Sequence, residues 1–163
     1  MATIIAPPYY GTVLQNGSSG PDVSLIQRWL NGLRSKWPAI RALVVDGKFG
    51  SNTTAAVKTF QTIVSITSDG KVGNVTWNNL YTEYAVLYGP SEIYPGTSMK
   101  NGNNGATVKS AQIKLQATVP TLVPDGKFGT KTQNATQVYQ SIHGLTVDGI
   151  IGKNTWASLY STM

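Results

Sequence analysis

A short segment occurs twice in this chain, and the repetition sets its architecture. The sequence Asp-Gly-Lys-Phe-Gly fills positions 46–50 and again positions 125–129. When residues 46–81 are placed on residues 125–160 without a gap, 17 of 36 positions are identical. The match continues upstream, from Asn16-Gly17 to Asn101-Gly102, once six extra residues in the first copy are allowed for. Repetition in a fixed register is typical of tandem structural units, so we predict two copies of one module.

The repeat divides the chain into four segments. We predict an N-terminal arm at 1–13, a first module at 14–81, a linker at 82–98 and a second module at 99–163. Modules of this size are close to the lower limit for a self-supporting core, and the chain has no cysteine to add disulfides. The linker is rich in aromatic residues, so we expect it to pack along one or both modules. The segment Pro7-Pro8-Tyr9-Tyr10 in the arm is expected to do the same.

Each module is predicted to fold into three helices separated by glycine-rich turns. The first helix starts at Gly20-Pro21-Asp22, because proline is favoured early in a helix, and its apolar residues recur with helical spacing: Val23, Ile26, Leu30 and Leu33. The second helix is expected to follow the repeated segment, with Ser51 or Thr130 capping its free amides. A second Asp-Gly turn then leads to a short third helix, which Trp77 or Trp156 anchors. The predicted fold class is all-α, without a sheet.

The composition argues against several classes of protein. Charged residues make up 12% of the chain and the net charge is +6. A basic excess attracts polyanions, but the Lys and Arg residues are scattered without a basic run, which argues against nucleic-acid binding. No run of 18 apolar residues occurs, so we predict no membrane span. Residues 1–11 lack the features of a secretory signal, so we expect an export signal elsewhere or a larger parent protein.

The sequence contains no recognisable catalytic or metal-binding constellation. Five of the seven acidic residues are aspartates, and four of these precede glycine, where they are expected to accept backbone amides in turns: Asp46, Asp69, Asp125 and Asp148. His143 is the single histidine, and three acids have no counterpart in the other copy: Asp22, Glu83 and Glu92. Glycoside hydrolysis needs two carboxylates set across the sugar bond, and a catalytic dyad or a zinc site would need partners that His143 lacks. We therefore predict no enzyme activity, no metal and no cofactor for this chain.

Five motif elements occur in the same order in both copies. They are a helix with Gln-x-x-Leu, an Asp-Gly-x-Phe-Gly turn, a helix with Thr and Phe-Gln, an Asp-Gly-x-Val-Gly turn and a closing Thr-Trp-x-x-Leu. This series resembles the peptidoglycan-binding domain of bacterial and phage cell-wall hydrolases, and the two copies cover 130 of 163 residues. The second copy departs from the pattern at Tyr139 and Ile151. The resemblance implies a compact three-helix fold, non-covalent recognition of wall polymer and no chemistry of its own.

The aromatic residues that recur are assigned to the core. Aromatic side chains at helical spacing are more often core residues than sugar-stacking platforms, and this applies to Phe49, Phe128, Trp77 and Trp156. Trp37 differs because it lies in the longer connection of the first copy and has no counterpart in the second. We interpret it as a lid over the first core in preference to a ligand contact, and it is the candidate aromatic residue for such a contact.

The variable position of the repeated turn suggests a binding groove. Lys48 and Lys127 occupy it, and their side chains should point to solvent beside the free amides of the second helix, where a carboxylate or carbonyl group is favoured. We predict one shallow groove per module, formed by Lys48, Asn52 and Thr53 in the first and by Lys127, Lys131 and Thr132 in the second. The supporting turns are expected to depend on Asp46, Gly47, Phe49, Gly50, Asp69, Gly70, Asp125, Gly126, Phe128, Gly129, Asp148 and Gly149.

The leading hypothesis is non-catalytic binding of cell-wall peptidoglycan, which targets an associated amidase, peptidase or muramidase to its substrate. The partners would be the glycan or stem peptide and a catalytic domain elsewhere, without nucleic acid or membrane. The chain would act as a monomer outside the cell, at the wall. The alternative is a protein-docking scaffold in a wall or spore assembly, with the aromatic linker as its interface. A nucleic-acid binder and an autonomous enzyme rank below both.

Overall fold

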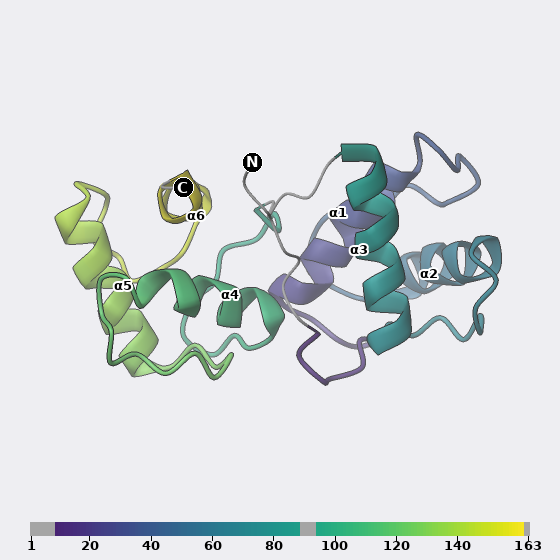
Figure 1. Ribbon diagram of the computed structural model, residues 1–163. Helices are drawn as coiled ribbons and strands as arrows, with labels where there is room; N and C mark the ends of the chain where they lie inside the picture. Colours follow the sequence, from purple (N-terminus) through teal and green to yellow (C-terminus); the bar gives the residue numbers. More distant parts are fainter. Residues whose placement is uncertain (1–8, 89–93, 162–163) are drawn as a thin grey trace.

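The described residues form six helices in two groups of three (Figure 1). The computed structural model describes residues 9–88 and 94–161. The first group contains α1 (Pro21–Leu33), α2 (Ser51–Ile63) and α3 (Asn74–Tyr88), and the second contains α4 (Ala106–Leu115), α5 (Thr130–Ile142) and α6 (Lys153–Ser161). Within these described ranges no strand forms, and extended backbone pairs only at isolated bridges such as Leu14 with Val72. The predicted all-α fold of two three-helix modules is confirmed.

The core of the first module lies between α1 and the helices that pack on it, α2 and α3. Trp29 of α1 meets Trp77 of α3 edge-on, with ring centroids 4.9 Å apart, and Phe49 and Phe60 are buried in the same cluster. Each fully buried large apolar side chain contributes about 1.5–3 kcal/mol. The apolar stripe that the sequence predicts on α1 is completely buried: Val23, Ile26, Leu30 and Leu33.

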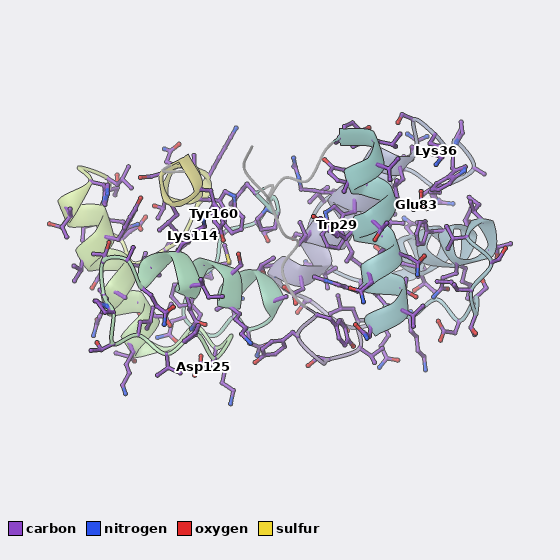
Figure 2. All side chains as sticks on the ribbon, viewed as in Figure 1. Trp29, Lys36, Glu83, Lys114, Asp125 and Tyr160 are labelled. Carbon is purple, nitrogen blue, oxygen red and sulfur yellow. The ribbon has the colours of Figure 1, made fainter. Side chains whose placement is uncertain are left out.

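The second module repeats this core with smaller or more polar residues. Where the first module has Phe60, the second has Tyr139, whose hydroxyl shares a hydrogen bond of 2.7 Å with Ser158 Oγ, so the added oxygen has a partner. Trp156 is buried and stacks on Tyr160 at 4.1 Å between centroids. Lys114 covers the same tyrosine ring, with Nζ 5.2 Å from its centroid (Figure 2).

The third helix of the first module is long, contrary to the prediction of a short one. It has 15 residues and extends to Tyr88, into the segment predicted as linker. The extension packs on Gly32 of α1, where ring atoms of Tyr84 occupy the space that a Cβ would need. Tyr88 also donates from its hydroxyl to the Gly32 carbonyl at 2.7 Å. In the second module the described part of α6 has 9 residues.

The second helix of each module lacks the predicted side-chain cap. Ser51 and Thr130 are the first residues of α2 and α5, and the cap positions belong to Gly50 and Gly129, which have no side chain to offer. The prediction that Ser51 and Thr130 cap these helices is therefore wrong. The first amides of both helices have no partner within the helix, and this leaves donors at the helix start.

The two modules meet at the N-terminal ends of α1 and α4 (Figure 1). The Asp22 carboxylate accepts hydrogen bonds from the amide of Ala106 at 2.8 Å, the amide of Thr107 at 2.9 Å and the Thr107 hydroxyl at 2.8 Å. Asp22 thus caps the first helix of the other module, whose own cap residue is glycine. Burial raises the pKa of the Asp22 carboxyl, against the three hydrogen bonds, which lower it. We name this contact the module junction.

The arm and the linker also connect the modules. Tyr9 lies 6.2 Å from Trp77 of the first module, whereas the Tyr10 ring lies on Gly126 of the second. In the linker, Tyr94 packs edge-on against Trp156 at 6.1 Å, and Thr97 shares a 2.8 Å hydrogen bond with Ser24. These residues pack along both modules, as predicted. The linker positions 89–93 and arm positions 1–8 lie outside the described residues.

Candidate binding site

One buried glutamine organises each Asp-Gly turn. In the first of them, Gln27 of α1 inserts between the turn and α2. Its Nε2 donates to Asp46 Oδ1 at 3.1 Å, to the Lys48 carbonyl at 3.0 Å and to Thr53 Oγ1 at 3.1 Å, so two N–H groups serve three acceptors. Its Oε1 accepts the amides of Asp46 and Gly47 at 3.1 and 3.0 Å. The glutamine therefore satisfies both the turn and the start of the next helix.

The same frame occurs four times in the described chain. Turn 1 is 46–53, turn 2 is 69–76, turn 3 is 125–132 and turn 4 is 148–155. In every turn the glutamine Nε2 reaches the aspartate, the carbonyl two residues later and a threonine hydroxyl, at 2.9 to 3.2 Å. All four glutamines are at most 1% exposed: Gln27, Gln61, Gln112 and Gln140.

The aspartate of each turn folds the backbone back on itself. Asp46 Oδ1 accepts the amide of Lys48 at 2.9 Å, and the intervening Gly47 has φ of 73°, a left-handed conformation that favours glycine. The hydrogen bond from Lys48 is the main cause that holds the pKa of the Asp46 carboxyl below its ordinary value. The same bond from the residue two positions later lowers the pKa of Asp69 and Asp125. These carboxylates are committed to the turns.

A cavity opens beside turn 1 at the start of α2. It has a volume of about 560 Å³, and its lining includes Lys48, Asn52 and Thr53 together with Ser18, Ser19 and Val44. Val44 is 78% exposed, so it presents an apolar surface next to the polar groups. The uncapped amides of α2 and the positive end of its dipole favour a negatively charged or carbonyl group here. The three groove residues predicted for the first module thus line one cavity.

Turn 3 has the equivalent cavity in the second module. Its volume is about 360 Å³, and it is lined by Lys127, Lys131 and Thr132 with Val123, which is 64% exposed. The lysines of both cavities are exposed, as is Asn52, whereas Thr53 and Thr132 are buried and accept from the glutamine Nε2. Figure 2 shows Asp125 of this turn at the outer edge of the second module. The turn 1 cavity therefore offers ammonium, amide and hydroxyl groups, and the turn 3 cavity offers ammonium and hydroxyl groups, each beside an apolar side chain and the turn aspartate.

Trp37 lies apart from these residues and is not in the lining of the turn 1 cavity. Its ring is half-buried and packs edge-on against Phe60 at 6.2 Å between centroids. Lys36 Nζ lies 4.5 Å from the Trp37 ring centroid and 3.4 Å from Glu83 on α3 (Figure 2). This is the position of a lid over the first core. A ligand contact by Trp37 stays a prediction.

The four glutamines had no predicted role, and turns 2 and 4 were predicted to be structural only. A signal was available, because Asp-Gly-x-apolar-Gly-x-x-Thr occurs at all four turns and a glutamine precedes each turn on a helix. The described residues hold no cluster of three or more His, Cys, Asp or Glu that could bind a metal ion. None of the described helices is long and apolar enough to cross a membrane.

Comparison with known proteins also finds two copies of one domain. The model of the peptidoglycan binding domain family matches residues 19–80 and 104–159. The chain belongs to this family, in two copies. Each match contains both turns of its module, so all four glutamine frames lie within the matched residues.

Several relatives of this chain are cell-wall enzymes. The N-acetylmuramoyl-L-alanine amidase CwlL of Bacillus licheniformis is 32% identical over 166 residues, which cover 91% of this chain and 45% of that protein. A spore cortex-lytic enzyme of Bacillus cereus is 33% identical over 114 residues, 70% of this chain and 40% of the enzyme. Among solved structures, the SleB N-terminal domain matches with 32% identity and a TM-score of 0.40, covering 45% of this chain and 94% of that domain. The chain spans less than half the length of these two enzymes.

Proposed function

We propose that the chain binds cell-wall peptidoglycan through the cavities at turns 1 and 3, and so brings an associated wall hydrolase to its substrate. The observation that carries the proposal is the recurrence of one cavity in both family domains. Each places an exposed lysine, Lys48 or Lys127, beside an uncapped helix start.

The chemistry of the cavities suits the peptide part of the polymer. A stem peptide carries carboxylate and amide carbonyl groups, whose oxygens accept hydrogen bonds. A lysine ammonium and the free amides of a helix start are the matching donors. Asn52 and Lys131 add donors in the same cavities. Val44 and Val123 offer apolar contact to methyl groups, such as those of alanine or of the lactyl link. No proton transfer or covalent step is needed.

Two weak sites on one chain suit an insoluble polymer. When one module is bound, the second meets its ligand at a high effective concentration, so the combined affinity exceeds that of either module. The module junction supports this, because Asp22 ties the first helix of one module to that of the other. Duplication therefore raises affinity without a new kind of contact.

The targeting role is supported by the relatives. The chain matches under half of an amidase and of a spore cortex-lytic enzyme, and we propose that a catalytic domain elsewhere acts on the wall that this chain holds. The setting would be extracellular, at the cell wall. The alternative is a protein-docking scaffold that would use the aromatic linker as its interface. This role is disfavoured because Tyr84 and Tyr94 pack on the chain's own modules.

Co-sedimentation with purified insoluble peptidoglycan tests the proposal, at low and high salt and with teichoic acid removed. We expect pelleting that weakens but persists at high salt, because salt screens the exposed ammonium groups only, and a loss of roughly tenfold or more in affinity for the double variant Lys48→Glu, Lys127→Glu. The matched control is Arg41→Glu, Lys100→Glu, which makes the same charge change at exposed residues outside both cavity linings. If the two double variants bind equally well, the cavities at turns 1 and 3 are not the binding site.

A further inference from the structure

Turns 2 and 4 have cavities of their own. The cavity at turn 2 has a volume of about 540 Å³ and that at turn 4 about 630 Å³. Both exceed the 360 Å³ of the turn 3 cavity, so a group that fits turn 3 has room in either. We infer that turns 2 and 4 are additional subsites for the same wall polymer, which gives the chain four binding points instead of two. This inference rests on the proposed function of turns 1 and 3.

The polar frame of the additional subsites matches that of the first pair. In turn 2, Gln61 Nε2 donates to Asp69 Oδ1, the Lys71 carbonyl and Thr76 Oγ1 at 3.0, 2.9 and 3.1 Å. These distances are within 0.1 Å of those made by Gln27 in turn 1. The glutamine therefore holds both turns by the same set of hydrogen bonds.

The side chains that line the turn 2 cavity repeat the chemistry of turn 1. Lys71 occupies the position that Lys48 holds in turn 1, and it is exposed and lines the cavity. Val75 is 60% exposed and lines the same cavity, and it supplies the apolar surface that Val44 supplies at turn 1. Asn74 adds an amide. A carboxylate or amide carbonyl next to a methyl group would meet the same partners at both turns.

Turn 4 reaches a similar composition by a different residue. Ile150 stands where the other turns have lysine, but Lys153 is exposed and lines the cavity from the first position of α6. The other polar residues of the lining are Asn154, Thr155, Thr146 and the turn aspartate Asp148. The positive charge is thus moved by three residues along the chain and stays in the same cavity.

The two cavities of each module are separate. Turn 2 folds back along α2, where a Cβ on Gly70 would meet Thr54 and Lys58, and turn 4 folds back along α5, where a Cβ on Gly149 would meet Gln133 and Gln137. The cavities at turns 1 and 2 share no lining residue, nor do those at turns 3 and 4, so two groups of one polymer can occupy both cavities of a module. Each module then binds through two points and gains from the effective concentration between them.

Amide chemical shifts of the whole chain, titrated with a soluble disaccharide pentapeptide released from peptidoglycan, test the inference. We expect saturable shifts at positions 74–76 and 153–155 in addition to 51–53 and 130–132. Shifts at 51–53 and 130–132 alone would overturn the four-site inference and leave the proposed function intact. Shifts at neither pair would overturn both.

Variants give an independent readout. In the background Lys48→Glu, Lys127→Glu, the further changes Lys71→Glu and Lys153→Glu should weaken pelleting with insoluble peptidoglycan by about tenfold more. The control adds Arg41→Glu and Lys100→Glu to the same background, at exposed residues outside the four cavity linings. Equal residual binding of the two quadruple variants contradicts the inference. Because Lys71 and Lys153 are exposed, circular dichroism should report unchanged folding.

Discussion

Replacing Asp22 by alanine should loosen the module junction. The change removes one acceptor from three donors, the amides of Ala106 and Thr107 and the Thr107 hydroxyl, at a side chain that is 7% exposed. Loss of a helix cap costs about 1 kcal/mol, and a buried donor left without a partner costs about 1–3 kcal/mol. Burial raises the pKa of the Asp22 carboxyl, so the cost of burying its charge offsets part of the stabilisation by these three hydrogen bonds. We therefore expect a net loss of about 2–3 kcal/mol.

Thermal unfolding and ¹⁵N relaxation measure the two consequences. At about 2–4 °C per kcal/mol for a chain of this size, the melting temperature should fall by about 4–12 °C. The modules should also tumble more independently than in the parent chain, since their strongest polar contact is gone. Glu83→Ala is the matched control, because it removes the same charge from an exposed ion pair of 3.4 Å, which is worth about 0–1 kcal/mol. If Asp22→Ala melts and tumbles like that control, the reasoning about the junction is wrong.

Two further predictions concern the turns. Gln140→Leu should destabilise the chain by about 3–5 kcal/mol, because it leaves Asp148, Gly149 and the Thr155 hydroxyl without their buried partner. Urea unfolding measures this loss. The control is Gln137→Leu, at a half-exposed glutamine of the same helix. The folded protein holds the pKa values of the Asp46, Asp69 and Asp125 carboxyls below 3.8, their value in the unfolded chain. These carboxylates therefore stabilise the fold fully above pH 3.8, and this stabilisation is lost as the pH falls through their folded pKa values. Urea midpoints should therefore drop with acidification below about pH 4, and drop less in the triple Asp→Asn variant; equal slopes would contradict the assignment.

The sequence was sufficient for features that depend on local chemistry. The apolar stripe of α1 is buried because its spacing matches a helix, and the Asp-Gly turns form because glycine adopts positive φ without strain. Features that depend on contacts across the chain were missed. The length of α3 depends on the missing side chain of Gly32, and the helix cap of α4 comes from Asp22, 84 residues away. Neither contact leaves a periodic or repeated mark in the sequence.

The candidate site was predicted in part, and the reason is again physical. Lys48, Asn52 and Thr53 come together because they are close in sequence on one turn and one helix start. The glutamines act from a preceding helix, so their role emerges only when the helix packs on the turn.

The glutamine frame separates what holds a turn together from what a ligand meets. At the variable position the frame uses only the backbone: the amide donates to the aspartate and the carbonyl accepts from the glutamine, whether the residue is Lys48 or Ile150. The side chain at that position is therefore free to change without loss of the fold, much as the loops of an antibody vary on a constant framework. A chain with four such turns could acquire a new wall specificity at one turn while the others retain the old one, and a laboratory library confined to positions 48, 71, 127 and 150 would explore this directly.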